Sequence, residues 1–590
     1  MRNWLCSIVI CAVLLAGCGK TSTPPATAHP LPGSPRVSQC ETGVHGGQLV
    51  LALPAPPRTF NPFLAFDASS DTITRLLFSP FVHFDQVSQV PGQGLAESWS
   101  VSDDQKTWTL KLRSGVYWSD GRPLTTDDVV FTWKELVLNT NYNRLTFDLF
   151  QINGQTFKVS RLDDLTVQVV TPEPFGPFLE FFCVLTILPK HVLQPYVTRE
   201  KFLDAYGLST TPASLVGSGP YRLKSYEPGK SMVLERNPEY WVADRAGKRL
   251  PYLDEVKFLF GAEPGSDLMM FINGESHVCE NPRPEFYPQF VQASAGGRFK
   301  VLDLGPGMER DFMWFNLNTG SNAAGNPFVD PAKRAIFARK EFRQAVAWAL
   351  DRQRIAREVY GGRAVPGEGF IGTENPRWQN PAVARYQHDP ARSRQLLADL
   401  GLRDGNGDGY VELPGGTNLT VALLSNTPNP NRERSAQIVV EDLKAVGLKF
   451  EVSMVDYRLL ITKITQDFDY ECALMGLGGG GVDPAAQINV LRSSGELHQW
   501  FPRQSAPATP WEARIDGLLN SLMRTTDYGE RKKAFDEIQA IMADELPMIY
   551  TISPLAFGAL TPNLRNVRPA VLSPYRLTWN IEELYLEGPR

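Results

Sequence analysis

The stretch "GLAESWSVSDDQKTWTLKLRSGVYWSDGRPLTTDDVVFTW", residues 94–133, carries the pattern that best indicates the fold. From Trp108 to Leu112 apolar and polar residues alternate, which is the period of a half-buried strand. Further on, Thr125 and Thr126 stand ahead of two aspartates, and a hydroxyl cap followed by early carboxylates suits the free amides at a helix start. The stretch therefore predicts a strand, a turn and a capped helix in succession.

The sequence on both sides of this stretch continues the mixture of strands and helices. Residues 47–53, "GQLVLAL", predict a buried strand, and residues 221–241 predict a hairpin that turns at Glu227-Pro228-Gly229. From Phe342 onward, apolar residues at helical spacing alternate with short apolar runs. This alternation predicts an α/β fold with parallel sheets covered by helices, and 590 residues predict more than one lobe.

The N-terminus has the pattern of an exported lipoprotein. An apolar run follows Arg2, and it ends in Leu15-Ala16-Gly17-Cys18, which resembles a lipobox. We expect a lipoprotein signal peptide over residues 1–17, a lipid on Cys18, and a disordered tether over residues 18–45, which are rich in Pro, Ser and Thr. No later apolar stretch is long enough to cross a bilayer. The protein is therefore expected outside the cytoplasm, held to the cell membrane by its lipid.

The net charge indicates which partners to expect, and the cysteine content indicates which disulfides are possible. The net charge is −5 and the basic residues are scattered, so no nucleic-acid partner is expected. Four cysteines remain after processing, and they allow either one or more disulfides or buried free thiols: Cys40, Cys183, Cys279 and Cys472.

The common catalytic and cofactor motifs are absent, and no cofactor is expected. Gly229-Lys230-Ser231 matches the end of a phosphate-binding loop, but Lys224 stands where the motif requires a glycine. No histidine pair has helical ligand spacing, no Cys-x-x-Cys occurs, and no Gly-x-Ser-x-Gly elbow occurs. A catalytic triad dispersed along the sequence remains open.

One loop has part of a calcium-binding pattern. Asp404, Asn406 and Asp408 stand at the first three ligand positions of an EF-hand loop, but its final glutamate is replaced by Gly415. Glu412 is the substitute ligand if calcium binds. The alternative is an Asx-rich turn between a helix and a strand.

Several long segments, taken in order, resemble the extracellular solute-binding proteins of the peptide/nickel class, which serve ABC importers. These segments are "GGQLVLAL" with "TFNPF", residues 94–133, "LPKH", "GSGPYRLKSYEPGKSMVLERNPEYW", "FNLN" and "FRQAVAWALDRQRI". The resemblance implies a bilobal periplasmic-binding-protein fold, class II-like with an extra subdomain, whose two lobes are joined by a hinge. It places the first lobe at 46–310 with a return at 548–590, and the second lobe at 311–547.

The resemblance also implies a ligand held between the lobes. The expected contacts are Phe60, Asn61, Trp118, Phe315, Asn316, Ser425, Asn426, the glycines Gly478, Gly479, Gly480 and Gly481, and Asp483. The glycines belong to "GLGGGGVDP", which follows a predicted strand at a sheet edge where ligands of parallel sheets bind.

The ligand class stays open at this point. In peptide-binding members a tryptophan and an aspartate precede an acidic-Pro pair, and that aspartate pairs with the ligand's α-ammonium. Here Leu477 replaces the tryptophan and Gly480 or Gly481 replaces the aspartate, while Asp483-Pro484 matches the pair. Without that countercharge, sugars, opines or other solutes become alternatives to peptides.

The sequence thus predicts the solute-binding component of an ABC importer. It is expected to be a non-enzymatic monomer that delivers a peptide or other small polar solute to permease subunits with cytoplasmic ATPases. The alternative is a secreted lipoprotein hydrolase with a dispersed catalytic triad.

Overall fold

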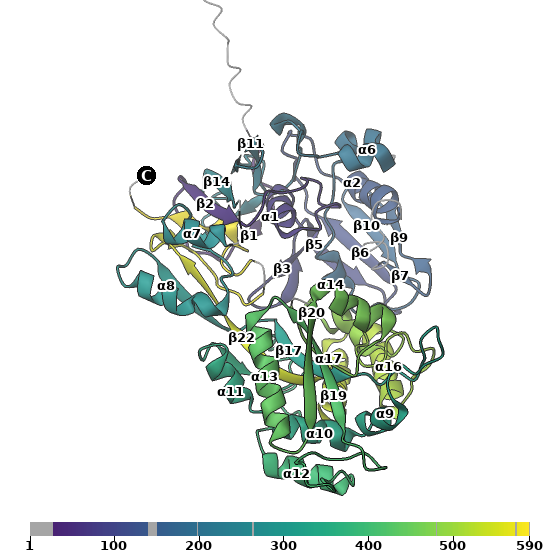
Figure 1. The fold of residues 1–590 in the computed structure, drawn as a ribbon. Coiled ribbons are helices and arrows are strands. Elements are labelled where there is room, and N and C mark those ends of the chain that lie inside the picture. The colour runs from purple at the N-terminus through teal and green to yellow at the C-terminus, as the bar shows by residue number, and fades with distance from the viewer. Residues whose placement is uncertain are drawn as a thin grey trace, which may run out of the picture.

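The chain folds into two lobes, and Figure 1 shows the first lobe above the second. The early part of the chain and its yellow end form the upper lobe, and the green middle part forms the lower one (Figure 1). Within the described residues no helix combines the length and apolar character that a membrane span requires. This computed structural model describes residues 28–139, 150–197, 199–261, 263, 265–478, 481–572 and 575–588.

The first lobe is built on one half of a 12-stranded sheet. The predicted strand at residues 47–53 is confirmed as β2, which lies between β14 and β15 and runs parallel to both. The predicted hairpin is also confirmed, as the antiparallel pair β11 and β12. The strands of this half are β2 (Gln48–Leu53), β11 (Tyr221–Glu227), β12 (Ser231–Arg236), β14 (Glu255–Phe260), β15 (Val278–Cys279) and β16 (Lys300–Pro306), and its helices are α1 (Ala68–Leu77), α7 (Ser266–Ile272) and α8 (Tyr287–Ser294).

A second, four-stranded antiparallel sheet forms an extra part of the first lobe. The predicted helix start is confirmed, because the Asp128 carboxylate accepts a hydrogen bond from the Thr125 amide at 3.0 Å while the Thr125 hydroxyl caps the helix. The elements of this part are β5 (Ala96–Val101), β6 (Thr107–Leu112), β9 (Lys158–Arg161), β10 (Thr166–Val170), α2 (Thr126–Phe131), α4 (Phe178–Phe182), α5 (Lys190–Leu193) and α6 (Arg199–Asp204). Short two-stranded pairs complete the lobe: β1 (Arg36–Val37) with β13 (Val242–Ala243), β3 (Val82–Asp85) with β4 (Val90–Gln93), β7 (Gln151–Ile152) with β8 (Gln155–Thr156), and β23 (Leu564–Arg565) with β24 (Tyr585–Leu586).

The second lobe uses the other half of the long sheet. β19 is parallel to both β20 and β21, as the alternation of strands and helices predicts. In α10 the residues Phe342, Ala345, Val346 and Ala349 form one buried face against the core. The strands are β17 (Arg310–Phe315), β18 (Ala364–Pro366), β19 (Thr420–Thr427), β20 (Lys449–Asp456) and β21 (Cys472–Leu477), and the helices are α9 (Pro331–Phe337), α10 (Lys340–Ala349), α11 (Arg352–Glu358), α12 (Pro390–Asp399), α13 (Pro430–Lys444), α14 (Tyr457–Thr462), α15 (Ile488–Leu491), α16 (Pro510–Met523) and α17 (Tyr528–Glu545).

The two lobes are joined by strand β22 (Ile549–Leu560) and by the link between β16 and β17. The first part of β22, up to Ile552, pairs with β17, and the part from Leu555 onward pairs with β16. Met548 and Ile549 therefore pack in the second lobe, and the return to the first lobe begins later than residue 548. The other crossing lies between Pro306 and Arg310. A two-strand connection of this kind is a hinge about which the lobes can close.

The segment that precedes the first lobe is packed, which differs from the tether expected over residues 18–45. Residues 1–27, which include the signal peptide and Cys18, lie outside the described residues. From His29 onward the chain lies on the first lobe: the His29 ring stacks on Tyr117 at 3.8 Å, β1 pairs with β13, and Cys40 is buried. A Pro- and Ser-rich segment cannot form a core of its own, but it can add backbone hydrogen bonds to an existing one. We call residues 28–45 the N-terminal strap.

The loop with the calcium-like pattern forms its own turn. The Asp404 carboxylate accepts hydrogen bonds from the amides of Gly407 and Gly409 at 2.7 and 2.9 Å, and Asp408 accepts one from Tyr410. Among the described residues, no group of three or more His, Cys, Asp and Glu side chains could hold a metal ion. The carboxylate oxygens of Asp404 thus form an Asx-rich turn. This is the alternative to the calcium site predicted at Asp404, Asn406, Asp408 and Glu412.

The four cysteines among the described residues are free thiols. Cys40, Cys279 and Cys472 are buried and Cys183 is half-buried. Burial raises the pKa of the Cys183 thiol well above its usual range, so this side chain is a neutral thiol at neutral pH.

Candidate functional site

A cavity of about 1200 Å³ lies between the two lobes. We call it the main cavity. The first lobe contributes Phe66, Glu180 and Val184, the second lobe contributes Asp483, and Met308 of the crossing lies at its edge. Its volume is in the upper range of ligand pockets, enough for a molecule of several residues or rings.

Two large apolar side chains of the main cavity are exposed. Phe66 is 67% exposed and Val184 is 64% exposed. Both line the cavity wall formed by the first lobe. Apolar surface gains free energy when it is removed from water, so these side chains are available for contact with a ligand.

A buried charge cluster spans the main cavity. Asp483 precedes a short helical turn at Pro484–Gln487, and its Oδ1 accepts hydrogen bonds from the Ala485 amide at 2.9 Å and from Arg531 at 2.6 Å. Its second oxygen, Oδ2, is buried and has no hydrogen-bond partner. Glu180, on α4 of the first lobe, lies 3.9 Å from the same guanidinium. Two carboxyl groups therefore share one Arg531.

The shared arginine leaves Glu180 without a full countercharge. Burial and, next, the charge of Asp483 raise the pKa of Glu180 to about 7, while Arg531 and Arg377 act in the opposite direction. With both carboxyl groups ionised the cluster of Asp483, Glu180 and Arg531 carries one net negative charge. A cation in the main cavity would compensate it.

The lobes touch directly beside this cluster. The Gly176 amide of the first lobe donates to the Met523 carbonyl at the end of α16, at 2.7 Å. Arg524 forms an ion pair with Glu173 at 2.7 Å, and the Thr526 amide donates to the Gln105 side chain at 2.9 Å. These contacts join the four-stranded part of the first lobe to the second lobe, so the structure has the lobes closed over the main cavity.

The predicted ligand residues of the first lobe do not line the main cavity. Phe60, Asn61 and Trp118 are fully buried within the lobe. The Asn61 side chain donates to the Ala205 carbonyl, and the Trp118 ring N–H donates to Asp128. Their polar atoms are used inside the lobe, so they support the fold around the site rather than contact a ligand.

Four predicted residues of the second lobe are also internal. Phe315 packs in the core, and the Asn316 amide donates to two backbone carbonyls of the chain near Tyr470. The Ser425 hydroxyl donates to the Leu474 carbonyl, and Asn426 accepts a hydrogen bond from Arg432. These placements correct the expected contacts at Phe315, Asn316, Ser425 and Asn426.

The glycine-rich loop reaches the main cavity at its end. Gly481 and Asp483 line the cavity, whereas Gly478, directly after β21, is exposed and does not. Gly479 and Gly480 lie outside the described residues. Of the predicted ligand residues, the structure thus brings Gly481 and Asp483 to the cavity.

Most residues of the cavity wall are not among the ligand residues predicted from the sequence. Glu180, Phe66 and Val184 come from segments whose local pattern indicates only helix or loop. Arg531 lies on α17 at a position that reads as a surface charge, yet its side chain is only 3% exposed. No local signal marks such residues, because their role depends on a partner from the other lobe.

The chain matches the model of a known protein family. The model described as bacterial extracellular solute-binding proteins, family 5 Middle, matches residues 91–499. A protein of Deinococcus radiodurans named "Probable ABC transporter-binding protein" is 28% identical over 513 residues, covering 83% of this chain and 84% of that protein.

Two further relatives differ in the ligand that their names give. The oligopeptide-binding protein AppA of Bacillus subtilis is 24% identical over 98% of this chain and 97% of that protein. Its solved structure, in complex with a nonapeptide, has a TM-score of 0.65 and covers 93% of this chain and 100% of that chain. A periplasmic alpha-galactoside-binding protein of Rhizobium meliloti is 27% identical, over 78% of this chain and 69% of that protein.

Proposed function

Because this chain belongs to family 5 of the bacterial extracellular solute-binding proteins, we propose that it captures a peptide with a free amine between its lobes and delivers it to the permease of an ABC importer. The transport role is inferred from the family to which the chain belongs. The amine and the peptide are inferred from the main cavity itself, in which a buried carboxylate oxygen has no partner.

The observation that carries the ligand assignment is the unpartnered Oδ2 of Asp483. A buried carboxylate oxygen that lacks a hydrogen bond is costly, and an ammonium group supplies both the bond and the missing charge. Glu180 provides a second acceptor from the opposite lobe. An amine placed between the two contacts both lobes at once, so it binds the closed form better than the open form. This pair takes the place of the single aspartate that the sequence lacks at Gly480 or Gly481.

The volume of the main cavity and its exposed apolar residues favour a peptide over a small amine. Phe66 and Val184 offer contact surface for side chains, and a cavity of about 1200 Å³ holds more than one residue. Relatives that bind oligopeptides are compatible with this, and the alpha-galactoside-binding relative makes sugars the competing ligand class.

Two measurements test the proposal. Mass spectrometry of the small molecules released from the purified, denatured protein should identify peptides with free N-termini. Calorimetric titration should then show tighter binding of free tetrapeptides than of their N-acetylated forms. Release of oligosaccharides, or equal binding of free and acetylated peptides, would contradict the amine assignment. Hydrolysis of the bound peptide would favour the hydrolase alternative.

We also propose that the protein is a monomer anchored by a lipid on Cys18. The family is extracellular, and the lipobox-like sequence at residues 15–18 supports an anchor. Cys18→Ser is expected to release the protein from membranes and to leave peptide affinity unchanged, since Cys18 precedes the packed strap. Fractionation of cells with a titration of the released protein measures both. Membrane retention of the variant would exclude the lipid on Cys18.

The raised pKa of Glu180 predicts a pH dependence of stability and of binding with opposite signs. A carboxyl whose pKa rises from its ordinary 4.5 to about 7 stabilises the ligand-free closed form at low pH, and this contribution is lost as the pH rises through 7. An ammonium ligand pairs with the ionised form, so its affinity should increase over the same window. Glu180→Gln should weaken both the loss of stability and the gain of affinity with rising pH. Melting temperatures between about pH 5 and pH 8, with and without peptide, measure them. Parallel profiles for the parent and the variant would contradict this role of Glu180.

A further inference from the structure

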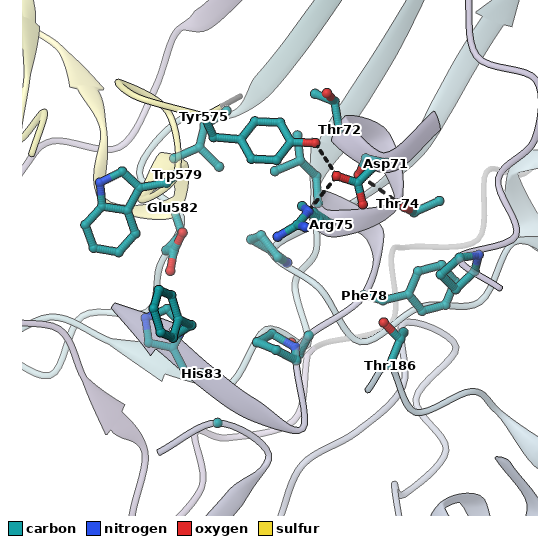
Figure 2. Close-up of a pocket in the computed structure, with 18 of the residues that line it drawn as sticks. Asp71, Thr72, Thr74, Arg75, Phe78, His83, Thr186, Tyr575, Trp579 and Glu582 are labelled. Atoms are coloured by element: carbon teal, nitrogen blue, oxygen red, sulfur yellow. Dashed lines mark hydrogen bonds and ion pairs between the residues drawn. The ribbon is translucent and has the colours of Figure 1, made fainter. Parts of the chain in front are cut away.

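A second, smaller pocket lies in the first lobe, next to the main cavity. It has a volume of about 320 Å³, at the lower end of the range for ligand pockets. We call it the side pocket. Figure 2 shows Tyr575 and Arg75 on one side of its open centre, Trp579 and Glu582 on another, and His83 below them. The two spaces adjoin each other, because both are lined by Arg75, Phe84, Gln86, Cys183, Val184 and Tyr575.

The charges that line the side pocket are already compensated. Arg36 of the N-terminal strap pairs with Glu582 at 2.8 Å. Arg75 pairs with Asp71 at 2.8 Å, and the Tyr575 hydroxyl donates to the same carboxylate at 2.6 Å (Figure 2). A charged group in this pocket would have to compete with one of these pairs. The side pocket therefore suits an uncharged group.

The walls of the side pocket are aromatic. Trp579, Tyr575 and Phe78 line it together with Trp241. His83 adds a neutral ring, since burial and then the positive charges of nearby arginines lower its pKa well below the ordinary value. Flat rings pack well against such walls by stacked or edge-to-face contacts.

One polar atom at the junction of the two spaces needs a donor. The Gln86 Oε1 is buried and has no hydrogen-bond partner, and Gln86 lines both the main cavity and the side pocket. An unsatisfied buried acceptor is costly, and a ligand N–H or O–H would satisfy it. An indole or a phenol combines a flat ring with such a donor.

We propose that the side pocket receives an aromatic side chain with a hydrogen-bond donor, that of tryptophan or tyrosine, from a peptide whose backbone occupies the main cavity. The inference rests on the proposed function and names the ligand more closely. The strap contributes to this site through Arg36, so the segment that leads toward the membrane anchor also forms part of the ligand-binding wall.

The test uses the full mature chain and a set of tetrapeptides with one variable residue on an alanine background, placed at each position in turn. Tryptophan and tyrosine at one position should bind roughly tenfold to a hundredfold more tightly than alanine there, and more tightly than phenylalanine. Thr186→Phe, which fills the pocket at a residue labelled in Figure 2, should abolish this preference but retain binding of tetra-alanine.

Two control variants separate the contributions. Thr186→Val keeps the volume of the side chain and should retain the aromatic preference. Gln86→Leu should remove the advantage of tryptophan and tyrosine over phenylalanine only. Equal affinity for all side chains, or an aromatic preference that survives in Thr186→Phe, would overturn the side-pocket assignment and leave the proposed function standing. Failure of every tetrapeptide to bind the folded protein would overturn both.

Discussion

Gly176→Val is expected to lower peptide affinity by more than about 100-fold, since it stops the lobes from closing. A Cβ atom at Gly176 would lie 2.8 Å from the Leu522 carbonyl oxygen and closer still to that of Thr525. Both oxygens belong to backbone at the end of α16, in the opposite lobe, so no side-chain rotation can relieve the overlap. The backbone of one lobe must therefore move away from that of the other, which opposes closure, and a ligand that contacts both lobes then loses contacts.

Small-angle scattering and titration calorimetry together measure this effect. The parent should show a smaller radius of gyration when its peptide is bound, whereas Gly176→Val should keep the larger radius at every peptide concentration. Gly92→Val is the matched control, because Gly92 lies in the same lobe and a Cβ there meets no atom within 4 Å. Melting of the ligand-free variants checks that each lobe still folds. Normal affinity in Gly176→Val would mean that the bound form is not the closed form described.

Asp483→Asn is expected to lower the affinity for free peptides by roughly 10- to 100-fold, the value of a charge-assisted hydrogen bond. The asparagine oxygen can still accept from the Ala485 amide, so the helical turn keeps its cap. With one carboxylate gone, Arg531 balances Glu180 and the cluster no longer attracts a cation. Affinity for N-acetylated peptides should change little.

The decisive quantity is the ratio of affinities for free and acetylated peptides. This ratio should be large in the parent and close to one in Asp483→Asn. Glu496→Gln removes a negative charge from the same cavity at an exposed position and should leave the ratio unchanged. A ratio that persists in Asp483→Asn would place the amine elsewhere in the cavity.

The packing of the N-terminal strap on the first lobe could not be predicted from its sequence. Its composition predicts an extended tether, and such a composition correctly indicates that the segment cannot form a core of its own. It does not reveal whether a neighbouring lobe offers free backbone groups. Here β13 pairs with β1, Cys40 is buried on the first lobe, and the half-buried Arg36 forms an ion pair with Glu582. The strap is ordered by its partner and not by its own residues.

Most of the ligand contacts predicted from the sequence also differ from the structure. Asn61, Trp118 and Asn316 combine polar atoms with apolar surroundings, which is also what a ligand-binding residue looks like in a sequence. In the structure their hydrogen bonds close within a single lobe. Whether a polar group is satisfied internally depends on the atoms that surround it, and a linear pattern does not contain that information.

The sequence by itself determined the fold class and the family, because strand alternation, helix caps and turns are set by residues close together along the chain. The capped start of α2 and the strand β2 are examples of such local order. Only the tertiary structure decided which residues form the site. Glu180 and Asp483 face one cavity because β22 and the link before β17 bring two separately folded lobes together. The burial of these two carboxyl groups, their shared arginine and the unpartnered oxygen of Asp483 result from the contact of segments that are distant in the sequence. They exist only once the chain has folded.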